Sequence, residues 1–465
     1  MRLIAPVILF AASPLAAQSS FEAHRPAAER LIASALKDSS AYKRLAYLTD
    51  TFGSRPSGSQ RLERAIDWIV AEMKRDGFEN VHTEPVMVTH WERGSESAVV
   101  ESPRRIVLHM LGLGRSVGTK PGGISAQVLV VRDFAELRAR RAEAKGKIIV
   151  YNFPFNTTVH PFVGYGEAVQ YRAYGPDSAV QFGAVATLAR SATPLSLQTP
   201  HTGALSYADT LRNAPNIPGA SITPEDAELL ARMQARGEQP VVRLTMGARM
   251  LPPARSRNVI AEIRGSEKPD EVIVLGGHID SWDVGTGAMD DAGGCVAAWE
   301  ALRLIKQSGV RPKRTIRVVL WTNEEIGLGG AFAYRDAHRA ELAKHIVAME
   351  SDNGVFKPRG ILFSGSEEGL AVARQFAQLL KSVGADSVET SGPEADVWPL
   401  NVLGVPTLAI NTDPTRYFWY HHTEADVVDI LDPREVALCA AVMAVVANTF
   451  ANTDVKLPRA PVAGS

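Results

Sequence analysis

The second half of the chain contains short apolar runs of strand length, each followed by a cluster of polar residues. Four such runs lie at 271–275, 315–321, 345–349 and 407–411 and are rich in Val, Ile, Leu and Ala. Apolar runs of this length, without a regular polar face, are typical of strands that helices cover on both sides. The pattern predicts the central sheet of an α/β protein.

The first part of the chain has helical periodicity instead. Between residues 27 and 76, large apolar residues recur at intervals of three, four or more positions, as on one face of successive helices. We expect this face to lie in the core. Its members are Leu31, Leu36, Leu45, Leu48, Leu62, Ile66, Ile69 and Met73.

Residues 118–246 have a different sequence pattern, in which short apolar runs alternate with Gly and Pro. Runs at 128–131, 146–151, 183–188 and 218–223 predict short strands joined by turns. We therefore predict an inserted β-rich domain at 118–246. The main domain would comprise residues 18–117 and 247–455, followed by a flexible tail at 456–465.

The amino terminus has the pattern of a secretory signal peptide. Arg2 precedes the apolar stretch Leu3–Ala12, and small residues around Ala17 offer a cleavage site. Removal of residues 1–17 would deliver a secreted or periplasmic protein, whereas the alternative is an uncleaved buried helix. Nowhere later does the sequence suggest the roughly 20 apolar residues of a membrane helix.

Composition excludes some partners and some sources of stability. The 465 residues carry a formal charge of −1 and no basic tract, which argues against nucleic acid as a partner. Two cysteines, Cys295 and Cys439, are too few to form the framework of the fold. Both lie in apolar, helix-like sequence, so we expect buried free thiols, although a disulfide remains an alternative in an oxidising compartment.

Imidazoles and carboxylates follow all four predicted strands. The ends of parallel strands converge on a crevice where ligands collect, so these side chains are expected to meet. Each pattern alone is commonly structural, but their convergence predicts a metal site. Oxygen and imidazole ligands without thiolate suit zinc, with cobalt or manganese as substitutes. The candidates are His278, Asp280, Glu324, Glu325, Asp352, His421 and His422.

The order of these motifs resembles that of the co-catalytic zinc exopeptidases, and within that family the carboxypeptidase Q branch. The resemblance extends from Leu48 to the last helix and includes the insert, which it identifies as a protease-associated domain. It implies an α/β/α sandwich with a mixed central sheet. The matching segments are His278–Asp280, Gly287–Gly294, Asn323–Gly327, Glu350–Gly354 and His422–Asp426.

The resemblance also implies a role for each residue. Asp290 would bridge two zinc ions, and Glu324 would be the general base that deprotonates water. Asp280 would hold the imidazole of a ligand in its correct tautomer. The choices of Asp290 over Asp291 and of His422 over His421 come from the family pattern, as does a cis peptide bond after Asp290. His278 and Asp352 would complete one metal site, and Glu325 and His422 the other.

The expected activity is hydrolysis of dipeptides or of the terminal residues of short peptides. A broad aminopeptidase acting on longer peptides, a single-zinc glutaminyl cyclase and a catalytically silent binding protein are the alternatives, and retention of all five ligand positions weighs against the last two. The family precedent suggests a homodimer. Tyr417–Tyr420 is interpreted as a wall of the substrate pocket or as core packing, and Pro200–Gly203 as a structural turn.

Overall fold

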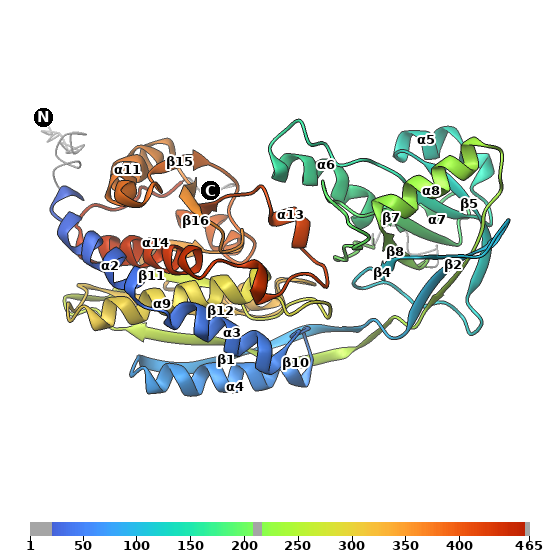
Figure 1. Ribbon diagram of the computed structural model, residues 1–465. Helices are drawn as coiled ribbons and strands as arrows, with labels where there is room; N and C mark the ends of the chain where they lie inside the picture. Colours follow the sequence, from blue (N-terminus) through green and yellow to red (C-terminus); the bar gives the residue numbers. More distant parts are fainter. Residues whose placement is uncertain (1–20, 208–215, 461–465) are drawn as a thin grey trace, which may run out of the picture.

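The computed structural model describes residues 21–207 and 216–460, and the predicted signal peptide at 1–17 lies outside them. The chain forms two bodies, each built on an eight-stranded sheet (Figure 1). The larger body carries the four predicted strands, and the smaller one is the insert.

The sheet of the main domain is mixed. Its four central strands β12, β11, β13 and β16 are parallel, whereas β1, β10 and β14 join it in antiparallel fashion. The four predicted strands are these central ones, which confirms the α/β fold class. In spatial order the sheet comprises β1 (Glu79–Glu92), β10 (Arg249–Ile263), β12 (Arg314–Trp321), β11 (Lys268–His278), β13 (His345–Glu350), β16 (Thr407–Thr412), β14 (Pro358–Ser364) and β15 (Ser387–Thr390).

Helices cover both faces of this sheet. In β11, Ile273 and Leu275 face one apolar core, while Val272 and Val274 face a second one. The predicted apolar stripe of the first helices lies in the first core, with Leu36 only partly buried. The first core includes α2 (Arg25–Lys37), α3 (Ser40–Phe52), α4 (Gln60–Arg75), α9 (Gly293–Gln307), α11 (Glu367–Ala377) and α14 (Pro433–Asn452), and the second includes α10 (Gly329–Ala337) and α12 (Trp398–Asn401).

Helix α14 qualifies the expectation that no late segment could span a membrane. Its length and hydropathy are those of a membrane-spanning helix, but 89% of its apolar window is buried inside the protein. It packs against α9 and α2 as the central helix of the first core. Cys295 and Cys439 lie in α9 and α14 as buried free thiols, as expected.

The insert is built on a second mixed sheet. The predicted strands correspond to the parallel strands β5 to β8, while β2, β3 and β4 lie before residue 118, so the sheet draws on more of the chain than 118–246. The insert is thus β-rich, as predicted, and helices accompany its sheet. Its strands are, in spatial order, β3 (Ile106–Leu108), β2 (Glu96–Ser102), β9 (Val241–Met246), β5 (Ile124–Val131), β6 (Ile148–Tyr151), β7 (Ala186–Arg190), β8 (Gly219–Ile222) and β4 (Met110–Gly112), and its helices are α5 (Phe134–Ala139), α6 (Pro161–Ala173), α7 (Gly175–Val180) and α8 (Pro224–Ala235).

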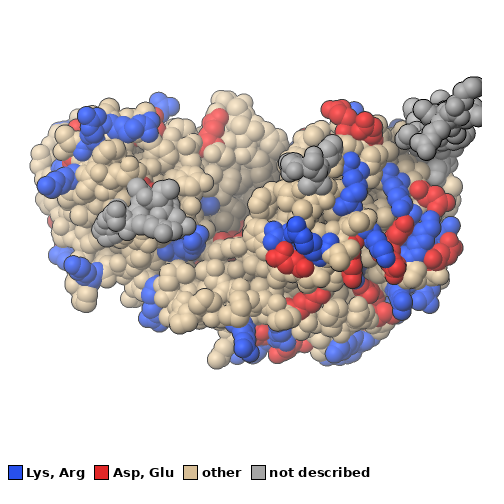
Figure 2. Space-filling model, turned by 180° about the vertical axis from the view of Figure 1, so that it is seen from behind, with Lys and Arg blue, Asp and Glu red and all other residues tan. Residues whose placement is uncertain are grey.

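Two long strands connect the bodies. Strands β1 and β10 pair from Glu79 and Glu262 at one end to Glu92 and Arg249 at the other, and run from the main sheet toward the insert (Figure 1). Seen from behind, a hollow separates the bodies (Figure 2). Short helical turns complete the fold: η1 (Arg141–Glu143), η3 (Ala288–Ala292), η4 (Leu342–Lys344), η5 (Gln378–Val383), η6 (Val428–Ile430) and α13 (Tyr417–Tyr420).

Candidate metal centre

The register of the central strands brings the candidate residues to one edge of the sheet. His278, the last residue of β11, lies opposite Trp321 at the end of β12, and Gly276 lies opposite Glu350 at the end of β13. Glu324, Glu325 and Asp352 therefore follow strands that stop at the same level. The convergence expected for parallel strands thus exists in the structure.

Asp290 lies at the centre of the cluster. Its Oδ1 is 3.1 Å from Nε2 of His278, and its Oδ2 is 3.2 Å from Nε2 of His422. The peptide bond between Asp290 and Asp291 is cis, as the resemblance implied. Asp426 holds the preceding backbone, because its carboxylate accepts hydrogen bonds from the amides of Ala288, Met289 and Asp290 at 3.1, 2.7 and 3.2 Å.

Asp291 has a different orientation. Its carboxylate accepts hydrogen bonds from the backbone amides of His278 and Gly294, at 3.0 and 2.9 Å. Both of its oxygens thus cap backbone donors, whereas both oxygens of Asp290 face imidazoles. This geometry supports Asp290 as the bridging carboxylate.

The remaining candidates form two groups around Asp290. In one, Oδ1 of Asp352 lies 3.3 Å from Nε2 of His278. In the other, Oε2 of Glu325 lies 3.3 Å from Nε2 of His422. Nε2 of His421 is farther from Asp290, at 3.7 Å, and its ring stacks on that of His422 with centroids 3.5 Å apart.

The insert fixes the orientation of His422. The backbone amide of Thr202 donates to the His422 carbonyl at 2.9 Å, and Nδ1 of His422 lies 3.3 Å from the Thr202 carbonyl. Arg172 of α6 donates to this same carbonyl at 3.0 Å. His422 has a φ of 62°, which non-glycine residues adopt infrequently, so these contacts hold a strained backbone. Pro200–Gly203, interpreted from the sequence as a structural turn, therefore contacts a candidate ligand.

Asp280 contacts both a candidate metal ligand, His278, and the candidate general base, Glu324. Its carbonyl, rather than its carboxylate, accepts the hydrogen bond from Nδ1 of His278 at 2.9 Å, while Oδ1 lies 3.9 Å from that nitrogen. The carboxylate instead accepts from the hydroxyl of Ser57 at 2.9 Å and from the amide of Glu324 at 3.1 Å. The resemblance led us to expect a contact between the Asp280 carboxylate and the His278 ring. The carboxylate does not make this contact because it is turned toward the Ser57 hydroxyl and the Glu324 amide.

The carboxylates of Glu324 and Glu325 are crowded. Burial, together with the nearby charges of Asp352 and Asp396, raises the pKa of Glu324 well above its usual range. Burial and the charge of Asp290 do the same to the pKa of Glu325. The protein alone therefore disfavours the negative charges that it has assembled here.

The donors present fit a pair of divalent cations. Oε1 of Glu325 and Oδ1 of Asp352 are buried and accept no hydrogen bond within the described residues. Buried carboxylate oxygens without donors are costly unless a cation satisfies them. Imidazole nitrogens and carboxylate oxygens, with no thiolate among them, are also the donor types that suit zinc.

Sequence reasoning missed Arg55, whose side chain is fully buried beneath the site. Its guanidinium donates to the carbonyls of Ile279, Thr286 and Gly287 at 2.7, 2.6 and 2.9 Å. It therefore supports both ends of the loop that connects β11 to the segment carrying Asp290. The only signal in the sequence was its place at the end of the motif beginning at Leu48.

The aromatic segment at α13 belongs to the boundary between the two bodies. Phe418 stacks on Tyr165 of α6 with ring centroids 4.5 Å apart, and Phe162 lies 5.3 Å from Tyr417. The hydroxyl of Tyr417 donates to the Asp352 carbonyl at 3.2 Å. The segment thus packs against the insert and also supports the loop of a candidate ligand.

A mixed sheet covered by helices, with a cluster of imidazoles and carboxylates at its strand ends, defines an α/β metallohydrolase. The chain belongs to peptidase family M28, whose sequence pattern matches residues 258–447. It is 46% identical to carboxypeptidase Q of Mus musculus over 419 residues, which cover 90% of this chain and 87% of that protein. Carboxypeptidase Q of Xenopus laevis is 47% identical over the same shares of the two chains.

Solved structures agree with this assignment. The crystal structure of a peptidase M28 precursor from Shewanella amazonensis superposes with a TM-score of 0.91 at 33% identity, covering 95% of this chain and all of that one. An aminopeptidase from Aneurinibacillus shares the fold, with a TM-score of 0.65 at 18% identity over 93% of this chain and 98% of that one. The protein is thus a metallopeptidase homologous to carboxypeptidase Q.

Proposed function

We propose that this protein is a dinuclear zinc exopeptidase that hydrolyses dipeptides or the terminal residues of short peptides. The observation that carries the proposal is Asp290, whose two oxygens face His278 and His422 at 3.1 and 3.2 Å. A carboxylate between two imidazoles is the arrangement expected of a residue that bridges two metals. The homology to carboxypeptidase Q supports a peptide as the substrate.

The residues around Asp290 would divide between the two ions. His278 and Asp352 lie on one side, and Glu325 and His422 lie on the other. When bound, a pair of zinc ions supplies a Lewis acid for the scissile carbonyl and lowers the pKa of the attacking water. Cobalt or manganese could substitute, since both accept the same ligand types.

Glu324 is proposed as the general base. Its carboxylate would take the proton of the attacking water and deliver it to the leaving amine. The backbone hydrogen bond to Asp280 fixes its position at the end of β12, at 3.1 Å. Burial raises the pKa of Glu324, which brings its proton affinity closer to that needed by the leaving group.

The test is hydrolysis of a dipeptide panel, with amino-blocked and carboxyl-blocked versions, by wild type and by Glu324→Gln. We expect kcat to fall by about a thousandfold while two zinc ions per chain remain bound. Glu368→Gln, at an exposed position of α11, is the matched control. Blocked peptides distinguish a dipeptidase from an aminopeptidase that accepts longer chains.

Two outcomes would contradict the proposal. Full activity of Glu324→Gln would assign the base to another residue. Wild type that binds zinc but hydrolyses no peptide would favour a binding protein.

Export and assembly are further proposals. We infer from the sequence of residues 1–17 that the protein is secreted or periplasmic, and amino-terminal sequencing of the mature protein should begin at Gln18. The family precedent supports a homodimer. Light scattering on the purified protein tests this assembly directly.

A further inference from the structure

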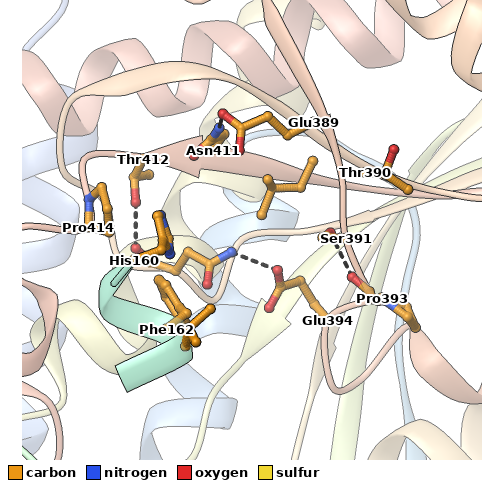
Figure 3. A pocket seen from close by; sticks show the side chains of 14 residues that line it. His160, Phe162, Glu389, Thr390, Ser391, Pro393, Glu394, Asn411, Thr412 and Pro414 are labelled. Carbon is orange, nitrogen blue, oxygen red and sulfur yellow. Dashed lines mark hydrogen bonds between the residues drawn. The ribbon is translucent and has the colours of Figure 1, made fainter. Parts of the chain in front are cut away.

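A cavity of about 430 Å³ lies beside the metal centre, between the main domain and the start of α6. Figure 3 shows Phe162 of the insert on one side and Glu394 of the main domain across from it. Most of the lining comes from β14, β15, β16 and the segment that follows β15.

The cavity is connected to the candidate metal ligands through one short loop. Asn353 lines the cavity and directly follows Asp352 in the chain. Its carbonyl accepts a hydrogen bond from the hydroxyl of Thr412 at 2.6 Å, which ties the loop to β16 (Figure 3). A peptide whose scissile bond lies at the metals would therefore have room for a neighbouring side chain in this cavity.

The charged groups of the cavity are acidic. Glu389 and Glu394 both line it, and none of its fourteen lining residues is Lys or Arg. Glu389 lies at an exposed position and accepts a hydrogen bond from the amide of Asn411 at 2.9 Å. Glu394 is less exposed and accepts one from the amide of Asn353 at 2.6 Å, so it is bound to the residue next to Asp352.

Within the described residues Glu394 forms no ion pair, and it accepts its hydrogen bond from the neutral side-chain amide of Asn353. A cation that entered the cavity would stabilise the ionised carboxylate and gain a charge-assisted hydrogen bond in return. A second carboxylate would instead be repelled.

We propose that this cavity receives a side chain of the substrate and that Glu394 is its specificity-determining residue. It selects a side chain that ends in a hydrogen-bond donor, with a lysine ammonium the best fit and a carboxylate the worst. Phe162 and Leu362 offer apolar surface to the methylene groups of such a side chain. The inference rests on the peptidase function proposed above and adds the substrate class.

The experiment compares kcat/KM for the dipeptides Xaa-Ala and Ala-Xaa, where Xaa is Lys, Met or Glu. Met matches Lys in length and lacks the charge. In one of the two series, wild type should favour Lys over Glu by at least about tenfold. Glu394→Gln keeps the shape and removes the charge, and it should reduce the Lys-to-Met ratio about tenfold, mainly through KM. The zinc content of Glu394→Gln should stay near the wild-type value.

A second readout separates this inference from the function on which it rests. Calorimetry measures binding of the same peptides to Glu324→Gln, with and without Glu394→Gln. Equal affinities for the Lys and Glu peptides, or a Lys-to-Met ratio that Glu394→Gln leaves unchanged, would overturn the role of Glu394. If the Lys peptide binds more tightly than the Met and Glu peptides but wild type hydrolyses none of them, the role of Glu394 stands and the peptidase proposal is overturned. Glu368→Gln again serves as the control for removal of an exposed charge.

Discussion

Asp280 connects His278 to Glu324. Its carbonyl accepts a hydrogen bond from Nδ1 of His278 at 2.9 Å, and its Oδ1 accepts one from the backbone amide of Glu324 at 3.1 Å. The same residue therefore orients an imidazole of the candidate metal centre through its main chain and the candidate base through its side chain. These two functions can be separated by mutation, because only one of them depends on the carboxylate.

Asp280→Ala should impair turnover more than metal binding. The substitution keeps the carbonyl that holds His278 but removes the acceptor of the Glu324 amide. We expect kcat to fall by about tenfold to a hundredfold, with zinc affinity changed by less than kcat. Steady-state kinetics and zinc titration against a competing chelator measure the two effects. A loss of zinc with kcat preserved in the reloaded enzyme would contradict this separation.

Arg172→Met should weaken the metal site on the side of His422. Arg172 donates to the Thr202 carbonyl at 3.0 Å, and that carbonyl also faces Nδ1 of His422. Without the Arg172 hydrogen bond, the Thr202 backbone holds His422 less firmly. We therefore expect zinc affinity to fall by about tenfold to a hundredfold at the metal site that contains His422, and not at the other. Chelator titration should then become biphasic.

A second variant tests the same contact from the opposite side. A Cβ on Gly203 would lie 2.2 Å from the guanidinium carbon of Arg172, so Gly203→Ala should displace that side chain and reproduce the effect. Arg232→Met, at an exposed position of α8, is the control. Wild-type chelator titrations for both Arg172→Met and Gly203→Ala would show that the insert is not needed for metal binding.

Removal of metal should lower stability as well as activity. Within the described part of the chain, Glu325 and Asp352 each keep a buried oxygen that accepts no hydrogen bond, and neighbouring carboxylates oppose their ionisation. Free zinc at a thousandfold above its Kd would stabilise the folded state by about 4 kcal/mol. Calorimetric scans with and without chelator should show a Tm several degrees lower in the metal-free protein, and added zinc should restore it. The same Tm in both conditions would argue against metal binding at these residues.

The sequence was sufficient to predict the central strands because neighbouring residues such as Ile273 and Val274 point to opposite faces of the sheet and both are apolar. Each central strand is therefore visible in the sequence as a continuous apolar run. The same logic placed His278 and Glu324 at one edge, since parallel strands end together. Strands β1 and β10 were not predicted, because β1 and the first half of β10 are largely exposed or half-buried, and the polar residues Asn258 and Glu262 interrupt the buried half of β10. Local patterns cannot show contacts between distant backbones.

The contact of Thr202 with His422 is the clearest example of that limit. Thr202 takes part only through its backbone amide and carbonyl and lies far from His422 in the sequence, so its side chain gives no signal of the contact. For the same reason, the role of Asp280 was predicted for its carboxylate, the group visible in the sequence, whereas the hydrogen bond to His278 uses its carbonyl.

His345 should make the fold sensitive to acid at a place remote from the candidate metal centre. The ring lies at the start of β13, where its Nδ1 donates to the Glu341 carbonyl at 3.1 Å and its Nε2 accepts from the hydroxyl of Tyr334 at 2.9 Å. Arg317 donates to that same hydroxyl at 3.1 Å, so the hydrogen bond from Tyr334 and the charge of Arg317 favour the neutral imidazole, whereas the bond to the Glu341 carbonyl favours the protonated one. Burial is the largest cause that lowers the pKa of His345, to about 4.

Because the folded state lowers this pKa, the unfolded state binds the proton more tightly. The contribution of His345 to stability is therefore complete above pH 6.5 and is lost as the pH falls toward 4. Between pH 7 and pH 5 the loss is about 2 kcal/mol of the free energy of unfolding. In urea unfolding across this range, the stability difference between wild type and His345→Gln should shrink by that amount as the pH falls, because glutamine does not titrate. A difference that stays constant would mean that His345 is protonated in the folded protein or can bind its proton there without cost.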